Sequence, residues 1–320
     1  MSRIAALMRA MEATARLTAS DALRPRSLLR KSPIQFSSAD PEGLWGDVLG
    51  FRRLGGRFRA SRRLVSILAW TLIAIPIQAL LLALPGRANV AFGQVYFRVL
   101  CWLIGLKIRV VGEATRQAPV LFVSNHSSWL DVLALGTTLD AAFVAKSEVG
   151  QWPLIRTVAR LGRTLFVSRT RTATKGEAGV IRERMGQGDS VILFPEGTTS
   201  DGGRVLPFRS AFLSVADHAR QVQPVSVVFD RLGGLPACRR DRPLFAWYGD
   251  TDIFTHFWRL ARHPGGRATV VLHEPVDPAD YPDRKALAAA CSEVIARACA
   301  TMRQNRPVVP LRAPLPRIPA

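Results

Sequence analysis

The stretch Val120-Leu121-Phe122-Val123-Ser124-Asn125-His126-Ser127-Ser128-Trp129-Leu130-Asp131 sets the fold expected of this chain. The apolar run at its start predicts a short buried strand. Ser127 and Ser128 then favour the start of a helix, which apolar residues continue. The pattern therefore predicts a strand, a sharp turn and a helix, with His126 in the turn and Asp131 in the first part of the helix.

A histidine and a carboxylate at this spacing can form a general-base pair. If the backbone turns sharply at Asn125, the Asp131 carboxylate can fold back onto the His126 ring. A carboxylate on one ring nitrogen fixes the tautomer and leaves the other nitrogen free to take a proton. The result is a Ser-His-Asp system without its serine, whose hydroxyl could come from a substrate. The alternative is an acid that caps a helix beside a satisfied histidine, and the pair alone does not decide.

A second stretch, Val191-Ile192-Leu193-Phe194-Pro195-Glu196-Gly197-Thr198-Thr199-Ser200, repeats the pattern of a buried strand followed by a polar turn. Together the two stretches resemble the glycerolipid acyltransferase family, typified by 1-acylglycerol-3-phosphate acyltransferases. The first motif of that family is Asn-His-x4-Asp, and the third is Phe-Pro-Glu-Gly-Thr-Arg-Ser. The resemblance covers roughly residues 107 to 275. It implies a glycerol-phosphate acyltransferase-like α/β domain, with a mostly buried sheet flanked by helices and preceded by an N-terminal membrane helix or hairpin.

The resemblance also implies roles for individual residues. His126 would be the general base, and Asp131 would orient it. The residues implied in acceptor binding are Asn125, Lys146, Arg169, Glu196, Gly197 and Thr198. A guanidinium suits that role, because its bidentate fork matches phosphate or carboxylate. Simpler alternatives stay open for three of them: a strand-end charge at Lys146, a surface arginine at Arg169 and a helix-capping carboxylate at Glu196.

Position 199 departs from the family's pattern, because this chain has threonine where the family usually has arginine. That arginine would contact an anionic headgroup, so its absence puts lysophosphatidic acid in doubt as the acceptor. Arg204 and Arg209 lie close downstream and could replace it. A lyso-ornithine lipid, which carries an amino-acid headgroup, is the alternative acceptor.

Two further histidines carry less weight. His256 lies near Asp250 and Asp252 and could imitate a second catalytic pair, within an aromatic segment that is core, interfacial face or acyl-tunnel wall. His273 is followed by Glu274 but lacks the second histidine of a zinc-protease helix, so we expect a structural role for it.

The chain is strongly basic, with 44 Lys and Arg against 24 Asp and Glu in 320 residues and a net charge of +20. Such an excess implies an anionic partner, either nucleic acid or an anionic membrane surface. Because arginines directly precede an apolar run, we expect membrane lipids as partners and no nucleic acid. The four cysteines have no metal-ligand spacing, so no metal site is expected, and Cys101 and Cys291 should be packed thiols.

The N-terminal third of the chain predicts a membrane anchor. Residues 1–63 are basic and expected to be partly disordered. The uncharged run from Leu64 to Leu84 is long enough to cross a bilayer. A single span would place the following domain outside the cytoplasm, away from cytoplasmic acyl donors. With the second apolar run, Val90 to Leu106, we predict that residues 64–106 form a hairpin or re-entrant anchor in the inner or plasma membrane, with both ends in the cytoplasm.

From Lys107 the pattern alternates between strand and helix, which is typical of an α/β domain. We expect an acyltransferase domain over 107–303 and a Pro-rich tail over 304–320 that is extended and mobile. The expected strands are 107–111, 119–124, 141–145, 164–168, 190–194, 224–229 and 267–273. The expected helices are 128–138, 151–161, 174–186, 209–219, 252–262 and 283–302.

The resulting hypothesis is a membrane-bound O-acyltransferase that needs no cofactor and forms no acyl-enzyme. No G-x-S-x-G elbow is present, which weakens a serine-hydrolase interpretation. The co-substrate would be acyl-CoA or acyl carrier protein. The acceptor would be 1-acylglycerol-3-phosphate, giving phosphatidic acid, or alternatively a lyso-ornithine lipid. A non-enzymatic basic protein that binds membrane surfaces or nucleic acid stays the remote alternative.

Overall fold

The computed structural model describes residues 56–146, 159, 164–167 and 174–315. The chain divides into two compact units, Met1–Phe51 and Arg52–Ala320, and every described residue lies in the second. Most of the predicted basic region, and nearly all of the predicted helix 151–161, therefore lie outside the described residues.

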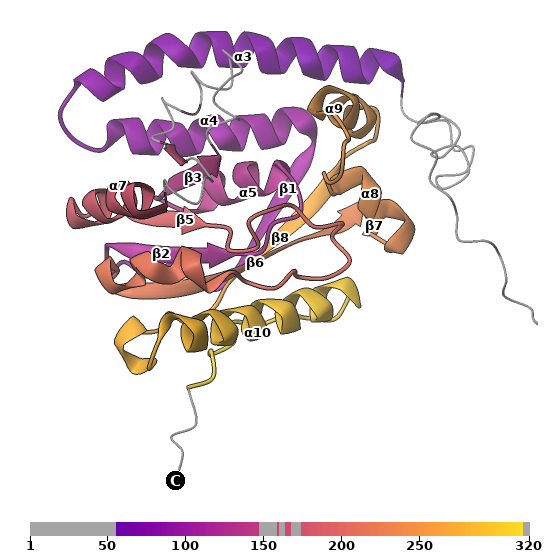
Figure 1. The fold of residues 1–320 in the computed structure, drawn as a ribbon. Helices are drawn as coiled ribbons and strands as arrows, with labels where there is room; N and C mark the ends of the chain where they lie inside the picture. The colour runs from indigo at the N-terminus through magenta and orange to yellow at the C-terminus, as the bar shows by residue number, and fades with distance from the viewer. Residues whose placement is uncertain (1–55, 147–158, 160–163, 168–173, 316–320) are drawn as a thin grey trace, which may run out of the picture. The chain divides into compact units, whose positions relative to one another are not determined.

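A mixed sheet of eight strands forms the middle layer of the described part of the chain (Figure 1). The strand order is β1-β8-β6-β2-β5-β3-β4, with β7 paired to β6. Neighbouring strands are parallel, except that β6 is antiparallel to β8 and to β7. The strands are β1 Leu106–Val111, β2 Val120–Ser124, β3 Ala142–Lys146, β4 Leu165–Val167, β5 Val191–Leu193, β6 Gln221–Leu232, β7 Leu235–Pro236 and β8 Gly266–Leu272.

Strand β2 lies between β5 and β6 and is parallel to both, and its residues are all buried. The carboxyl ends of parallel strands meet at the same edge of a sheet, where ligands bind in open α/β folds. The turns that follow β2 and β5 therefore come together. These two turns carry the two motifs that the sequence singled out.

Helices cover both faces of the sheet, which confirms the predicted α/β architecture (Figure 1). Side chains alternate along β2, so Phe122 joins a core with α4 and α5 while Leu121 and Val123 join a core with α10. The helices are α3 Arg57–Ala83, α4 Ala88–Ile104, α5 Leu130–Thr138, α7 Thr174–Gly186, α8 Arg242–Phe245, α9 Ile253–Ala261 and α10 Arg284–Arg303. The 3-10 segments are η2 Ser210–His218, η3 Arg239–Asp241 and η4 Pro278–Asp280.

One predicted helix differs in type, because residues 209–219 contain the 3-10 segment η2 instead of an α-helix. No side chain caps the start of this segment. At its two ends the amides bond the carbonyls three residues back, Phe212 N to Arg209 O and Ala219 N to Ala216 O, which is the 3-10 pattern. The predicted strand 224–229 is longer than expected, because β6 pairs with three neighbours over Gln221–Leu232.

Helices α3 and α4 form a hairpin that lies along the α/β domain (Figure 1). Helix α3 begins at Arg57, seven residues before the predicted start at Leu64, and it is the one described helix long and apolar enough to cross a membrane. Many apolar side chains on the hairpin are exposed: Phe58, Val65, Leu68, Leu72, Ile73, Ile77, Leu80, Leu82, Val95 and Trp102. The hairpin thus presents a broad apolar surface away from the domain.

A buried arginine holds the start of α3 against the domain. The Arg63 guanidinium donates hydrogen bonds to the carbonyl oxygens of Ala261, His263 and Pro264, at 3.0, 2.8 and 3.3 Å. These carbonyls lie at the end of α9, where a cation is also favoured by the helix dipole. This arginine therefore belongs to the packing of the hairpin rather than to a free basic patch.

The prediction of a mobile tail is wrong for residues 306–315, which are extended but docked on the domain. Glu274 N donates to Leu311 O, and Leu311 N donates to His273 Nδ1 at 3.1 Å. Ala313 is 2% exposed. Prolines favour extended backbone and lack a donor, and such a segment can still pack where its remaining amides find acceptors.

Candidate active site

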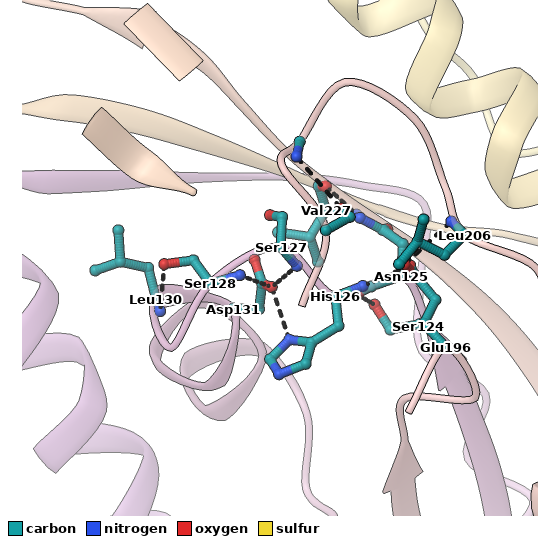
Figure 2. A network of polar contacts seen from close by, with 12 residues as sticks. Ser124, Asn125, His126, Ser127, Ser128, Leu130, Asp131, Glu196, Leu206 and Val227 are labelled. Atoms are coloured by element: carbon teal, nitrogen blue, oxygen red, sulfur yellow. Dashed lines mark hydrogen bonds and ion pairs between the residues drawn. The ribbon is translucent and has the colours of Figure 1, made fainter. Parts of the chain in front are cut away.

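His126 and Asp131 meet at the carboxyl end of β2, as their spacing predicted. The distance between His126 Nδ1 and Asp131 Oδ2 is 2.9 Å. Asp131 is fully buried and lies in the first turn of α5, where the helix dipole favours a negative charge. Figure 2 shows the ring with Nδ1 directed at the carboxylate and its other nitrogen directed away from it.

The hydrogen bonds around Asp131 fix the protonation of the ring. Asp131 Oδ2 also accepts from the backbone amides of Ser127 and Ser128, at 2.7 and 2.8 Å. An oxygen that already accepts from two backbone amides acts as an acceptor toward the ring as well. The proton of the neutral ring therefore belongs on Nδ1, and Nε2 has the free lone pair of a general base.

The second turn holds the histidine in place. The ring of Phe194, which follows β5, stacks on the His126 ring with centroids 4.0 Å apart and planes 18° apart. The backbone amide of His126 donates to Glu196 Oε1 at 2.9 Å, and its carbonyl accepts from Ser200 N at 2.9 Å. The His126 side chain keeps 19% of its surface exposed, so a substrate can reach the ring.

Glu196 braces the backbone. Its second oxygen, Oε2, accepts from the amide of Leu206 at 3.1 Å, and the residue is only 2% exposed. Burial raises the pKa of Glu196 to about 7, and the two amide bonds only partly offset that rise. Both oxygens are thus engaged with loop amides inside the fold, and neither amide begins a helix, so Glu196 is observed to brace the two turns rather than to cap a helix.

Asn125 is likewise used inside the fold. Its side chain exchanges two hydrogen bonds with the backbone of Val227 in β6, at 2.9 and 2.8 Å, and the residue is 3% exposed. The predicted substrate-binding role finds no support in this geometry, because the amide group that would contact a ligand is already paired. Its observed role is to fix the turn that carries His126 against β6.

No described side chain supplies a nucleophile to His126. Within residues 56–146 and 174–315, no serine, threonine or cysteine hydrogen bonds the ring. No group of three or more His, Cys, Asp or Glu that could hold a metal ion occurs among the described residues. The arrangement can therefore remove a proton from a hydroxyl that arrives with a substrate.

Comparison with known proteins agrees with this chemistry. A family model described as Acyltransferase matches residues 107–229. The lyso-ornithine lipid O-acyltransferase of Brucella abortus (strain 2308) is 37% identical over 242 residues, which cover 73% of this chain and 91% of that protein. This chain belongs to the acyltransferase family.

Two other relatives extend the comparison. The lyso-ornithine lipid O-acyltransferase of Rhizobium meliloti (strain 1021) is 36% identical over 67% of this chain and 77% of that protein. The 1-acyl-sn-glycerol-3-phosphate acyltransferase of Neisseria gonorrhoeae is 31% identical over 63% of this chain and 76% of that protein.

A solved structure shares the fold of this acyltransferase. The crystal structure of the 1-acyl-sn-glycerophosphate acyltransferase PlsC from Thermotoga maritima matches with a TM-score of 0.53 and 20% identity, over 75% of this chain and 98% of that chain. The likeness confirms the glycerol-phosphate acyltransferase-like α/β fold that the sequence predicted.

Of the remaining predicted site residues of the acyltransferase, some lie near the catalytic turns, and others lie outside the described part of the chain. Gly197 has φ +71°, and a Cβ built there would come within 3.4 Å of Arg209 Nε, so Arg209 lies beside this turn. Thr198 and Arg204 are exposed, and no contact brings Arg204 to the His126 ring within the described residues. Lys146 ends β3, but its side chain lies outside the described part of the chain, as does all of Arg169.

The other histidines do not form catalytic pairs. His256 Nδ1 accepts from Trp129 Nε1 at 3.0 Å, its Nε2 donates to Ala246 O, and burial lowers its pKa to about 4. His256 therefore forms no catalytic pair with Asp250 or Asp252, in line with the small weight given to that pairing, because both ring nitrogens are already used. His273 is structural, as expected, with bonds to Ser226 and Leu311.

The buried thiols also agree with prediction, since Cys101 and Cys291 are 3% and 0% exposed. Sequence reasoning missed two contacts that shape the site. The stacking of Phe194 on His126 could have been inferred from the sequence, because Phe194 directly precedes Pro195 in the second motif. The hydrogen bond from Trp247 N to Ser127 O, at 2.8 Å, could not be inferred from the sequence, where the only indication is a local richness in aromatic residues.

Proposed function

We propose that this acyltransferase moves an acyl chain from acyl-CoA or acyl carrier protein to the free hydroxyl of a lysolipid. The observation that carries the proposal is the free Nε2 of His126, next to a buried carboxylate and without a protein nucleophile among the described residues. A histidine so placed activates a substrate hydroxyl directly, so the reaction needs no acyl-enzyme.

The proposed reaction has two chemical stages. His126 Nε2 takes the proton of the acceptor hydroxyl while the hydroxyl oxygen attacks the thioester carbonyl. Asp131 stabilises the imidazolium that forms, through the Nδ1 bond. The tetrahedral intermediate then collapses with expulsion of the thiolate, a good leaving group that can take the proton back from His126. The products are the acylated lipid and free CoA or acyl carrier protein, and no cofactor is required.

For the acceptor we propose a lyso-ornithine lipid, with 1-acylglycerol-3-phosphate as the second candidate. Thr199 stands where the phosphate-binding arginine of the family is usual, and the relatives from Brucella and Rhizobium carry the lyso-ornithine name. The Neisseria relative supports the second candidate. In both cases Arg209, beside the Gly197 turn, is the proposed headgroup contact, with Arg204, Arg169 and Lys146 as further candidates.

We propose a membrane location with the active site facing the cytoplasm. Helix α3 is apolar enough to cross a bilayer, yet Arg63 binds its start to α9 and the hairpin packs along the domain. A helix that is tied to the domain at its start and packs against α4 supports a re-entrant or one-leaflet anchor over a single span. The partners would be membrane lipids and the acyl donor, with no nucleic acid.

The test is acyl transfer by membranes that contain this chain. Labelled acyl-CoA and acyl carrier protein are offered with lyso-ornithine lipid and lysophosphatidic acid as competing acceptors, and His126→Ala is the control. We expect ornithine lipid as the main product, and we expect it to depend on His126. If phosphatidic acid is the only product and its formation depends on His126, the acceptor is 1-acylglycerol-3-phosphate instead of lyso-ornithine lipid. Acylation of either lipid that persists in His126→Ala would contradict the mechanism.

A further inference from the structure

A small cavity lies behind the catalytic turn. Its volume is about 40 Å³, and its lining includes Ser127, Ser200, Arg242 and Arg303 but not His126. A water molecule needs roughly 10–15 Å³ of such space. The cavity can therefore hold one small polar group. Ser127, which follows His126 in the chain, lines it and so connects it to the catalytic turn.

Two guanidinium groups face this cavity together. Arg242 begins α8 and Arg303 ends α10, so the fold brings them together from distant parts of the chain. Burial and the charge of Arg303 both lower the pKa of Arg242. Like charges in a partly buried space repel, so an anion that joins such a pair is attracted by both groups and lowers their repulsion.

No carboxylate in the described part of the chain makes an ion-pair contact with either guanidinium, although the nearby charge of Asp201 acts to raise the pKa of Arg242. Asp230 also lines the cavity, but its oxygens accept hydrogen bonds from Arg267 and Thr269. Asp201 is exposed, and its Oδ1 accepts from Gly203 N at 2.8 Å. Neither acid forms an ion pair with Arg242 or Arg303 among the described residues.

Further hydrogen-bond donors in the cavity have no acceptor. Ser127 is 5% exposed, and its hydroxyl oxygen, which is not closed off from solvent, is open to a ligand because no hydrogen bond to it occurs within the described residues. Arg303 donates from Nη1 to Gly203 O, but its buried Nε has no partner among the described residues. Buried donors are nearly always paired, so the open Arg303 Nε points to an acceptor from outside the chain, and the Ser127 hydroxyl is placed to bind the same acceptor.

We infer that Arg242, Arg303 and Ser127 form a subsite for an oxyanion, a carboxylate or phosphate group, of the acceptor's headgroup. The inference rests on the proposed function. Guanidinium groups suit either oxyanion, and apolar walls such as Phe245 and Met302 strengthen the attraction by excluding water. Because Ser127 adjoins His126, an anion held here would fix where the rest of the acceptor lies relative to the base.

Steady-state kinetics on membranes tests the subsite with three variants. Arg242→Gln removes the charge, Arg242→Lys keeps it without the fork, and Arg240→Gln removes one charge from an exposed neighbour in the same segment. We expect Arg242→Gln to raise the KM for the lysolipid on the order of tenfold or more, with kcat and the KM for acyl-CoA little changed. Arg242→Lys should fall between, and Arg240→Gln should match wild type.

Two kinetic results would overturn the inference. One is an equal KM for the lysolipid in Arg242→Gln and Arg240→Gln. The other is a rise in the KM for acyl-CoA alone, which would assign the oxyanion to the phosphates of the donor. The KM values for lyso-ornithine lipid and lysophosphatidic acid show whether binding of the carboxylate or of the phosphate is weakened more by Arg242→Gln. A rise in either KM supports the subsite.

An anion-binding measurement separates this inference from the proposed function. Inorganic sulfate should raise the melting temperature of the full chain in detergent, because a ligand that binds only the folded state stabilises it. We expect the shift in wild type and Arg240→Gln and its loss in Arg242→Gln. If wild type acylates neither lipid, the proposed function fails while this measurement still tests the cavity. An equal shift in all three proteins would contradict the subsite.

Discussion

Two histidines follow strands of the same sheet and do different work. His126 comes after β2, keeps an exposed edge, binds one carboxylate through Nδ1 and leaves Nε2 free. His273 comes after β8 and is 1% exposed. Its Nδ1 accepts from Leu311 N, and its Nε2 donates to Ser226 Oγ at 2.8 Å. Burial lowers the pKa of His273 to about 4, so it stays neutral where most proteins work.

The contrast lies in the unused nitrogen and not in the residue type or the nearby acid. Both histidines have an acid close in sequence, Asp131 in one case and Glu274 in the other. Only Asp131 points at a ring, because the turn after Asn125 brings α5 back over it. A base needs a free lone pair within reach of substrate, whereas a structural histidine has both nitrogens satisfied.

The largest effect is expected from Asp131→Asn, which removes the orienting charge from His126. An asparagine can keep its carbonyl oxygen where the three donors converge, but it lacks the negative charge that stabilises the imidazolium. We expect turnover to fall on the order of 10²–10⁴-fold. Asp140→Asn, at an exposed acid on the surface, is the control and should keep wild-type turnover. Equal turnover in both variants would remove Asp131 from the mechanism.

The next effect concerns acid stability at His273. Its folded-state pKa of about 4 lies below the ordinary 6.5, so the unfolded chain binds a proton that the folded chain excludes. The stability it contributes is present above pH 6.5 and is lost as the pH falls from 6.5 toward 4. His273→Asn should remove this loss, worth up to roughly 3 kcal/mol, in unfolding measured across that range. An unchanged pH profile would mean that the site is not buried as described.

Glu196 is expected to give the opposite pH dependence of stability to His273. Its folded-state pKa, raised from 4.5 to about 7, means that the folded chain holds a proton that the unfolded chain releases. Its contribution to stability is therefore full below pH 4.5 and is lost as the pH rises to about 7, by up to roughly 3 kcal/mol. Glu196→Gln should flatten this part of the profile. A profile of the same slope in the variant would refute the assignment.

The smallest effect is expected where the tail meets His273. Leu311 is partly buried against the core, and its amide bonds the ring. Leu311→Ala should lower the free energy of unfolding by about 1–2 kcal/mol without changing turnover. Leu315→Ala, at a side chain that is 53% exposed, is the matched control. Equal stability of the two variants would mean that the tail does not dock in solution.

The sequence predicted the sheet and the catalytic pair well, because both depend on local patterns. An apolar run before a polar turn is enough to predict β2 and β5, and the spacing of His126 and Asp131 fits one helical start. The docking of the tail could not be predicted from the sequence, because it depends on where His273 lies in the folded chain. A Pro-rich composition predicts extended backbone but does not say what the backbone contacts.

Roles within the site were harder to predict than the site itself. Asn125 and Glu196 both belong to the matching motifs, yet their side chains bind backbone groups of Val227, His126 and Leu206. A motif gives the residue types and their order, whereas the direction of each side chain depends on strands that are far apart in sequence. Arg242 and Arg303 lay outside both motifs, and only the fold brings them to one cavity.

The central claim is that His126 is the base and His273 is not. The most direct measurement is turnover of acyl-CoA and lyso-ornithine lipid by His126→Ala and His273→Asn side by side, at pH 7.5 and at equal amounts of folded protein. We predict a loss on the order of 10²–10⁴-fold for His126→Ala and near-normal turnover for His273→Asn. Near-normal turnover in His126→Ala, or an equal loss in both variants, would contradict the account.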